Sequence, residues 1–461
     1  MIAGSRATRA TTTPWQRLES LCDGGTLRPL PAHDGDRLAV VAGEGRVEGR
    51  DVVCYAQDSR LCGGSVGVAE AEAIVAALRS ARHRGAPVVG FLESAGARIQ
   101  EGAAALGGLG RVFYENVALS EQVPQISIVT GTAAGGGCYS PALTDFVVMV
   151  QGASMFLTGP MVVQEALGEQ ISAESLGGAQ VHERNGVCHF VATDDEGAIA
   201  TARELLSFLP ARVGEAGQWH APVPPARSDP GAVVPADRRK VYEVREVVRR
   251  IVDEGSVLEV CAKWAPSLVT AFARLDGRPV GIVASQPRHL AGVLDVEASE
   301  KGARFVRICD TYRIPLLVLV DTPGFMPGSR QEVAGVIRHG AQLVRAFAAA
   351  TVRRCTVILR KAYGGAYITM NSKDLGADRV FAWPRAEVGI MSPQSAVRVI
   401  HRRRLDGATG GEVAGLADAY ARRHLPVRLA VERGLVDAIV APEDTRATLV
   451  AALGGFDPTR R

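Results

Sequence analysis

Apolar runs, amphipathic stretches and glycine-rich turns alternate along this chain of 461 residues. Apolar runs predict buried strands at Ile126–Val129 and Leu316–Asp321, and alternating apolar and polar positions predict strands within Leu38–Tyr55. Apolar residues recur at helical spacing near residues 68–83 and 298–312. Strands that alternate with helices in this way predict a protein of the α/β class.

The stretch Pro124–Val150 combines these signals with candidate chemistry. Its strand leads into a glycine-rich turn, Gly131–Gly137, and Ser140-Pro141 marks the start of a short helix before a second apolar run. Because glycine has no Cβ atom, a carbonyl group can approach the backbone, and successive N–H groups at a helix start can point at one oxygen. The turn is a candidate oxyanion hole, although such turns more often serve packing alone.

The chain contains this arrangement twice. The segment APVVGFLESAGAR, from Ala86, is matched by IPLLVLVDTPGF, from Ile314, and SIVTGTAAGGGCYSP is matched by TVILRKAYGGAYITM. Both pairs are separated by about 230 residues, so their order and spacing agree with an internal duplication. We infer two similar domains, each with a strand that ends in a Gly-Gly turn.

The predicted domain organisation follows from this duplication. We expect a disordered tail at 1–14, an N-terminal domain at 15–220, a linker at 221–240 and a C-terminal domain at 241–461. The tail is rich in Thr and lacks the apolar core of a secretory signal. The linker is rich in Pro and shows no periodicity.

The composition is that of an ordinary globular protein, with 47% hydrophobic and 22% charged residues. No apolar run reaches the roughly 18 uncharged residues of a membrane span, so we expect a cytoplasmic protein without a membrane partner. A net charge of +3 gives no indication of nucleic-acid binding. The eight cysteines are scattered without CxxC pairs, which predicts buried thiols and neither a metal site nor a disulfide framework.

Three further features of the sequence are candidates for catalytic, metal or nucleotide sites. Gly63–Gly67 matches the G-x-S-x-G elbow, but no triad context accompanies Ser65. His182 and His189 lack the helical spacing of metal ligands, so we expect them to order loops. The DTPG sequence at Asp321–Gly324 resembles a nucleotide switch, but the absence of a G-x-x-x-x-G-K-[ST] loop excludes a nucleotidase.

Two carbonyl-binding turns without a strong side-chain base restrict the chemistry. One oxyanion hole stabilises one enolate, so two of them suit a reaction between two carbonyl compounds that each become enolate-like. Such a protein needs to orient both partners and exclude water more than to supply a general acid or base.

Several ordered runs carry a family resemblance: ESAGARIQEG, AGGGCYSPALTD, EASEKGARFVRICDTYRIPL, DTPGFMPGSRQE and RKAYGGAYITMNSK. They resemble the carboxyltransferase (β) subunit of biotin-dependent acyl-CoA carboxylases, with the nearest likeness to actinobacterial acetyl/propionyl-CoA carboxylase β subunits. The resemblance covers nearly the whole chain beyond the Thr-rich tail.

This resemblance implies two tandem crotonase-like ββα-superhelix domains, the N-terminal one for acyl-CoA and the C-terminal one for carboxybiotin. The carboxyl group would pass to the α-carbon of acetyl-CoA or propionyl-CoA, giving malonyl-CoA or methylmalonyl-CoA, with biotin as the base. The thioester oxyanion hole would be the N–H groups of Gly135 and Gly136, and the ureido hole those of Gly365 and Ala366. A homohexamer built from dimers is implied as well.

The resemblance also points to substrate-contacting residues. Ile368 stands where propionyl-preferring relatives carry Asp and acetyl-accepting ones carry Ile, which predicts a broad or acetyl-accepting enzyme, and a plain core role is an equal alternative. Arg98 is a candidate for binding substrate phosphate or for a buried ion pair, with the ion pair favoured. Ala97 and Tyr139 are further substrate-binding candidates.

One segment departs from the family pattern. Where relatives read VMGAKGAV, this chain reads IMSPQSAV from Ile390. Ser392 and Ser395 replace two glycines and Pro393 enters the turn, which predicts a stiffer loop on the biotin side. The sequence has neither an ATP-grasp signature nor an Ala-Met-Lys-Met biotinylation site. We therefore expect a partner, the biotin carboxylase/biotin carrier (α) subunit, to supply carboxybiotin.

Several alternatives remain open from sequence. The subunit of a biotin-dependent decarboxylase shares every motif, and a pathway-dedicated paralogue would use a different acyl acceptor. A crotonase-like hydratase or hydrolase would need a Glu pair or a triad, and neither is evident. A non-catalytic scaffold would tolerate loss of the Gly-Gly turns, and both turns are intact.

Overall fold

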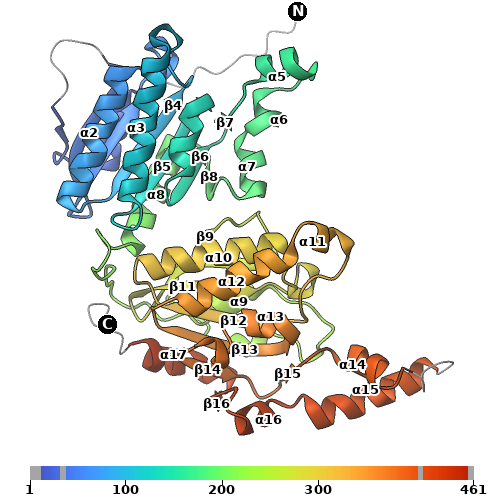
Figure 1. The fold of residues 1–461 in the computed structure, drawn as a ribbon. Helices are drawn as coiled ribbons and strands as arrows, with labels where there is room; N and C mark the ends of the chain where they lie inside the picture. Colours follow the sequence, from blue (N-terminus) through green and yellow to red (C-terminus); the bar gives the residue numbers. More distant parts are fainter. Residues whose placement is uncertain (1–11, 32–37, 403–408, 455–461) are drawn as a thin grey trace, which may run out of the picture. The chain divides into compact units, whose positions relative to one another are not determined.

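The computed structural model describes residues 12–31, 38–402 and 409–454, and the chain divides into two compact units between Val213 and Gly214 (Figure 1). Of the expected tail at 1–14, residues 1–11 lie outside the described residues. Pro14 is already the first residue of helix α1 (Pro14–Leu21), and the Thr13 side chain caps this helix by accepting a hydrogen bond from the Gln16 backbone N–H.

The first unit is built on one mixed sheet in the order β1-β2-β3-β4-β5-β6-β8. Strands β1 to β3 pair antiparallel and the others parallel, and the short β7 pairs with the end of β5. The bounds are β1 (Arg28–Pro29), β2 (Val40–Val47), β3 (Arg50–Gln57), β4 (Val88–Ser94), β5 (Gln125–Ala134), β6 (Phe146–Val150), β7 (Ser154–Phe156) and β8 (Phe190–Ala192).

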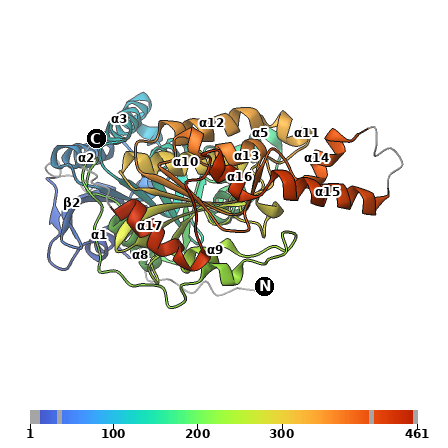
Figure 2. The same ribbon diagram turned by 90° about the horizontal axis from the view of Figure 1, so that it is seen from below.

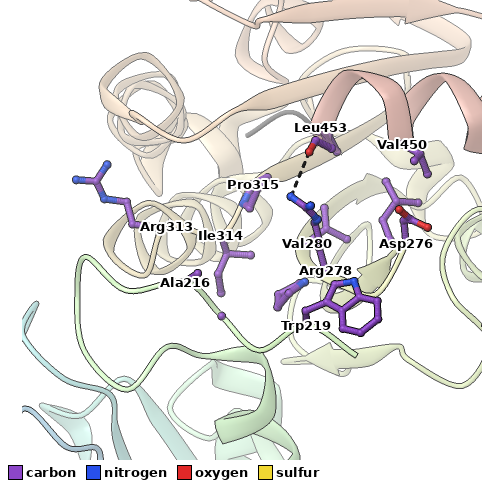
Figure 3. A pocket seen from close by; sticks show the side chains of 14 residues that line it. Ala216, Trp219, Asp276, Arg278, Val280, Arg313, Ile314, Pro315, Val450 and Leu453 are labelled. Carbon is purple, nitrogen blue, oxygen red and sulfur yellow. Dashed lines mark hydrogen bonds between the residues drawn. The ribbon is translucent and has the colours of Figure 1, made fainter. Parts of the chain in front are cut away.

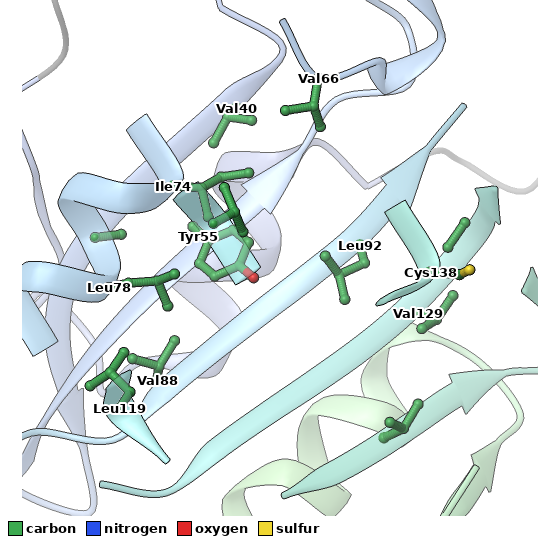
Figure 4. Packing of buried hydrophobic residues seen from close by; sticks show 14 of the residues in the cluster. Val40, Tyr55, Val66, Ile74, Leu78, Val88, Leu92, Leu119, Val129 and Cys138 are labelled. Atoms are coloured by element: carbon green, nitrogen blue, oxygen red, sulfur yellow. The ribbon is translucent and has the colours of Figure 1, made fainter. Parts of the chain in front are cut away.

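Helices cover both faces of this sheet. Helices α2 (Val68–Arg84) and α3 (Ala103–Leu119) lie side by side on one face, and Figure 2 shows α1 and α8 (Asp195–Phe208) on the other. Leu78 and Leu119 of the first pair are fully buried against the sheet, beside Tyr55 (Figure 4). Because both faces are covered, β4 to β6 read as nearly continuous apolar runs. The remaining helices are α4 (Tyr139–Ala142), α5 (Pro160–Leu167), α6 (Ala173–Gly177) and α7 (Ala179–Asn185).

The second unit repeats this plan with the order β16-β14-β13-β12-β11-β10-β9, and β15 pairs with the end of β13. Its strands are β9 (Leu258–Val260), β10 (Leu268–Leu275), β11 (Arg278–Ser285), β12 (Leu316–Thr322), β13 (Arg354–Tyr363), β14 (Arg379–Ala382), β15 (Glu387–Gly389) and β16 (Ala438–Ile439). Its helices are α9 (Val244–Arg249), α10 (Val296–Thr311), α11 (Ser329–Val333), α12 (Val336–Ala349), α13 (Gly364–Thr369), α14 (Pro393–Ile400), α15 (Gly410–His424), α16 (Val427–Glu432) and α17 (Thr445–Gly454).

The pairing registers confirm the internal duplication. In the first unit β4 and β5 pair in parallel from Val88 and Gln125, and the register shifts between Leu92 and Ser94. In the second unit β12 and β13 pair in parallel from Leu316 and Arg354, with the same shift between Val320 and Thr322. The duplicated sequences therefore build the same local geometry at the strand ends that lead into the glycine turns.

Residues 221–240, which the sequence predicts to be a linker, belong to the second unit and make hydrogen bonds to its other elements. The backbone N–H of Glu254 donates to the Val223 carbonyl at 2.7 Å, and Arg360 Nη1 donates to the Lys240 carbonyl at 2.8 Å. The segment also forms a 3₁₀ turn, Pro230–Val233. Its irregular backbone has hydrogen-bond partners elsewhere in the second unit. Hydrophobic periodicity along the sequence carries no information about such contacts.

A buried ion pair holds the DTPG segment in place. The Asp321 carboxylate is fully buried and accepts hydrogen bonds at Oδ2 from Arg360 Nε at 2.8 Å and from the Tyr242 hydroxyl at 2.9 Å. The Arg360 guanidinium lies 4.7 Å from the centre of the Tyr242 ring. Burial raises the pKa of Tyr242, so its hydroxyl stays protonated and donates. Asp321 thus ties β12 to β13 and to the chain before α9.

We predict that Asp321→Ala lowers the free energy of unfolding by roughly 3–5 kcal/mol, because it leaves the Arg360 charge buried without its partner. Asp51→Ala is the matched control, since Asp51 pairs with Arg46 across 3.3 Å at a site where both side chains are 60% exposed. The control should change stability by less than about 1 kcal/mol. Equal denaturation midpoints for the Asp321 variant and the unmodified protein would contradict this role.

Candidate functional site

The first glycine turn lies at the carboxyl end of β5. It continues as a 3₁₀ turn, Gly135–Cys138, directly into α4. Gly135 has φ +57°, a left-handed conformation that side chains with a Cβ rarely adopt, and a Cβ placed there would meet only the Leu157 carbonyl oxygen, at 4.0 Å. The Gly135 backbone is therefore open on this side, as a candidate oxyanion hole requires, whereas a Cβ on Gly136 would lie 2.7 Å from Leu109 Cδ1.

The second glycine turn lies at the carboxyl end of β13 and starts α13. Gly364 has φ +61° and so takes the place that Gly135 has in the first unit. A Cβ placed on Gly365 would lie 3.8 Å from Phe325 Cε2, an ordinary contact, and Gly365 is exposed. The Thr369 hydroxyl donates to the Gly365 carbonyl at 2.9 Å and so fixes this first helical turn.

The two turns match residue for residue. Since Gly135 corresponds to Gly364, Gly136 corresponds to Gly365 and Gly137 to Ala366. Gly135 and Gly136 lie together at one helix start, and Gly365 and Ala366 lie together at the other, as expected from the sequence. The two predicted pairs are therefore not equivalent. Gly135 and Gly136 are the first two residues of the first turn, whereas Gly365 and Ala366 are the second and third residues of the second turn.

A buried polar network positions the first turn. The Ser140 hydroxyl in α4 donates to Asn116 Oδ1 at 2.8 Å, and Asn116 Nδ2 donates to Gln125 Oε1 at 3.1 Å. Burial raises the pKa of the neighbouring Tyr55 to about 12, so this hydroxyl is neutral. Sequence analysis missed Asn116 and Gln125, and the only available signal was polar residues at otherwise apolar positions of α3 and β5.

Arg98 is occupied by protein partners. Its guanidinium forms ion pairs with Glu70 at 2.7 Å and Glu101 at 3.2 Å and donates to the Ser65 carbonyl at 2.9 Å. Burial alone would raise the pKa of Glu70, but the hydrogen bond from Arg98 and its charge outweigh burial and lower it. These contacts favour the ion-pair role over binding of substrate phosphate. They also fix the loop that carries Ala97.

Tyr139 and Ile368 occupy matched positions after the two turns. Tyr139 is the first residue of α4, is 49% exposed and packs its ring edge-on against Phe113, with 5.9 Å between ring centres. Ile368 is 51% exposed in α13. This exposure argues against the plain core role for Ile368 and leaves both side chains available to a ligand held at the adjacent backbone.

Ser65, His182 and His189 form hydrogen bonds within the protein. The Ser65 hydroxyl accepts from Arg98 Nε at 3.3 Å, His182 Nε2 lies 2.8 Å from the Met155 carbonyl oxygen, and His189 Nδ1 accepts from the Val147 N–H at 3.0 Å. His182, in α7, thus contacts strand β7, and His189 contacts strand β6, so the two side chains join helices and strands where the sequence predicted contacts with loops. Within the described ranges we find neither a cluster of three or more potential metal-ligating side chains nor a helix long and apolar enough to cross a membrane.

The IMSPQSAV segment forms a helix start. Pro393 is the first residue of α14, and the Ser392 hydroxyl caps it by accepting from the Ser395 N–H at 3.3 Å. Helix α5 of the first unit likewise starts at a proline, Pro160. The expectation of a stiffened loop is therefore corrected, because the proline lies where helices accept it and its missing N–H costs no hydrogen bond.

A separate cavity of about 230 Å³ lies at the opposite end of the second sheet, where β11 and β12 begin (Figure 3). Trp219, Ile314 and Pro315 give it an apolar wall, and Arg278 at its edge donates to the Gly454 carbonyl at 3.1 Å. It is remote along the strands from the carboxyl-end turn, so the candidate chemistry does not use it.

A glycine turn at the same strand end in each of two tandem α/β units agrees with the class of two-domain crotonase-like carboxyl transferases. Residues 10–455 match the family model described as "Carboxyl transferase domain". The chain belongs to this family.

Among curated relatives, the chain is 46% identical to the "Methylmalonyl-CoA carboxyltransferase 12S subunit" of Propionibacterium freudenreichii subsp. shermanii, over 92% of this chain and 82% of that protein. It is 45% identical to the "Propionyl-CoA carboxylase beta chain" of Saccharopolyspora erythraea, over 96% and 87%. It is 44% identical to the "Biotin-dependent acetyl-/propionyl-coenzyme A carboxylase beta5 subunit" of Mycobacterium tuberculosis, over 93% and 80%.

Solved structures give the same result. The crystal structure of transcarboxylase 12S, a hexamer assembly with methylmalonyl-coenzyme A and methylmalonic acid bound, superposes with a TM-score of 0.93 at 43% identity, over 97% of this chain and 90% of that one. A single-chain, multi-domain long-chain acyl-CoA carboxylase gives a TM-score of 0.84 at 27% identity, over 95% and 47%. These findings confirm the predicted family and the crotonase-like fold. The protein is a biotin-dependent acyl-CoA carboxyltransferase of the propionyl/acetyl-CoA carboxylase β type.

Proposed function

We propose that this protein transfers the carboxyl group of carboxybiotin to the α-carbon of acetyl-CoA or propionyl-CoA and forms malonyl-CoA or methylmalonyl-CoA. The observation that carries the proposal is the pair of matched, accessible glycine turns at Gly135 and Gly364. We further propose that a biotin carboxylase/biotin carrier (α) subunit is the partner, that the chain works in the cytoplasm, and that it assembles as a hexamer. The hexamer reported for transcarboxylase 12S supports the assembly.

The two turns have separate tasks in this proposal. The N–H groups of Gly135 and Gly136 bind the thioester oxygen and stabilise the charge that it gains as the α-proton leaves, and those of Gly365 and Ala366 bind the ureido oxygen. The neighbouring side chains Tyr139, Ile368 and Phe325 are uncharged, so these contacts exclude water and orient the reactants. The amides of Gly365 and Ala366 would hold the biotin carried by the partner, which would supply the carboxyl group and the base for the α-proton.

The reverse half-reaction tests this function without the partner. Purified protein is incubated with free biotin and malonyl-CoA or methylmalonyl-CoA, and the formation of acetyl-CoA or propionyl-CoA is followed. We expect conversion that depends on biotin. A protein that converts neither substrate would contradict the proposal. A reaction that never runs forward when the biotin carboxylase partner, ATP and bicarbonate are supplied would favour the decarboxylase alternative.

We predict that Gly365→Val lowers kcat by about 100-fold or more while the protein stays folded, because the side chain excludes the ureido oxygen from the turn. Gly365 lies outside the left-handed region, so this variant avoids the backbone strain of about 1–2 kcal/mol that Gly135→Val adds. Gly110→Ala, in α3 with nothing within 4 Å of its new Cβ, is the control and should keep full activity. Normal turnover in both Gly365→Val and Gly135→Val would contradict the assignment of the two turns as oxyanion holes.

We predict that the unmodified enzyme converts malonyl-CoA at least as fast as methylmalonyl-CoA, because Ile368, exposed beside the second turn, would face the acyl group across the dimer interface that the family resemblance implies and would give the acyl pocket an apolar wall. Ile368→Asp should shift the ratio of the two kcat/KM values toward methylmalonyl-CoA by about tenfold or more. Ile439→Asp, 43% exposed in β16, is a control for the added charge. If the ratio of the two kcat/KM values is unchanged in the Ile368 variant, the residue has a structural role and does not determine specificity.

A further inference from the structure

The cavity of about 230 Å³ at the start of β11 and β12 is lined by residues of the second unit alone (Figure 3). Its wall is mainly apolar and includes the side chains of Leu275, Val280, Ile314, Pro315, Val450 and Leu453. A cavity of about 150 Å³ with a wall of this kind is large enough to bind benzene. The space therefore accepts an apolar group at least as large as a phenyl ring.

Trp219 forms one side of this cavity and is fixed although it is 61% exposed. The carbonyl of Gln218 before it accepts from Arg274 Nη1 at 2.6 Å, and the N–H of His220 after it donates to the Gly277 carbonyl at 2.9 Å. A Cβ placed on Gly277 would lie 2.8 Å from Trp219 Nε1, so the indole ring rests on this glycine. A fixed and exposed aromatic ring offers contact area to a ligand at small cost in conformational entropy.

Two side chains of opposite charge border the apolar space. Asp276 and Gly277, with φ +54° and +77°, form the two-residue turn between β10 and β11, and Arg278 begins β11. Both Asp276 and Arg278 are exposed and line the cavity. Among residues 12–31, 38–402 and 409–454 neither forms an ion pair, and the Arg278 guanidinium donates to the Gly454 carbonyl at 3.1 Å. Arg313 also lines the cavity, but its guanidinium points away from these groups (Figure 3).

This arrangement is complementary to a molecule that has an apolar body and carries both charges at one end. A guanidinium binds a carboxylate through paired N–H groups, and a carboxylate accepts hydrogen bonds from an ammonium group. A simple carboxylic acid would leave Asp276 without a partner, and a simple amine would leave Arg278 without an anion. An α-amino acid carries a carboxylate, an ammonium group and a side chain on one carbon atom, so it satisfies all three features together.

We propose that this cavity binds a free α-amino acid with a large apolar side chain. Arg278 binds the carboxylate, Asp276 binds the ammonium group, and the apolar side chain enters the cavity beside Trp219. The site lies at the opposite strand end from the glycine turn of the second unit, so the bound amino acid does not contact the reacting groups. It joins the β10–β11 turn to the end of α17 and stabilises the second unit, because it binds only the folded chain.

Titration with L-phenylalanine tests the site, with binding followed by NMR as saturation transfer from the purified full chain to the ring protons. We expect a Kd of about 1 mM or lower, which is ordinary for a ligand of this size. Hydrocinnamate lacks the ammonium group and phenethylamine lacks the carboxylate, so each should bind about tenfold more weakly. L-Alanine should not displace L-phenylalanine, because its methyl group leaves the cavity empty.

Two charge-removing variants separate the two contacts. Asp276→Asn keeps the turn, since Asn-Gly favours the same type I′ geometry, and should weaken binding of L-phenylalanine about tenfold while leaving that of hydrocinnamate unchanged. Arg278→Gln should weaken both carboxylates and leave phenethylamine unchanged. Arg249→Gln is the matched control, because Arg249 pairs with Glu246 in α9 and does not line the cavity. All three variants should keep the rate of the reverse half-reaction.

The opposite results overturn the proposal. Absence of saturation transfer to L-phenylalanine in the unmodified protein does so directly. Equal affinity for L-phenylalanine and hydrocinnamate, with no effect of Asp276→Asn, excludes an amino-acid site. Unchanged affinity in both Arg278→Gln and Trp219→Ala places the binding elsewhere on the protein. Carboxyl transfer is judged separately, by the reverse half-reaction of the unmodified protein, and neither result depends on the other.

Discussion

The left-handed backbone of one glycine at each strand-to-helix turn is the constraint on which this structure depends. Gly135 and Gly364 have φ values of +57° and +61°, and each lies directly after the last residue of a buried parallel strand. A residue with a Cβ at either position would strain the backbone or redirect the helix. The amides of the following residues are aimed by this single conformation. The flanking strands, helices and loops hold it in place.

Buried polar contacts next to the turns provide that support. In the second unit Asp321, at the end of β12, binds Arg360 of β13. In the first unit Glu93, at the matching place in β4, pairs with Arg17 of α1 at 3.4 Å. Both acids hold the carboxyl end of the sheet to a segment distant in sequence. The fully buried Asp321–Arg360 pair is costly to break and contributes little net stability, so its main effect is to fix geometry, whereas the Glu93 side chain is 26% exposed and its pair with Arg17 is weaker.

The duplicated scaffold separates what the two turns share from what distinguishes them. Backbone pairing, the register shift and the left-handed glycine are repeated, so the backbone at the two strand ends has the same geometry. The side chains beside the turns differ, since Tyr139 in the first unit stands where the second unit has Ile368.

The sequence by itself determined the α/β class, the glycine turns, the duplication and the family resemblance, because periodicity and glycine placement act over a few residues and repeat at a fixed separation. Tertiary structure alone decided that Arg98 is occupied by Glu70 and that residues 221–240 form part of the second unit. These features depend on contacts between residues far apart in the chain, and no local pattern encodes such contacts.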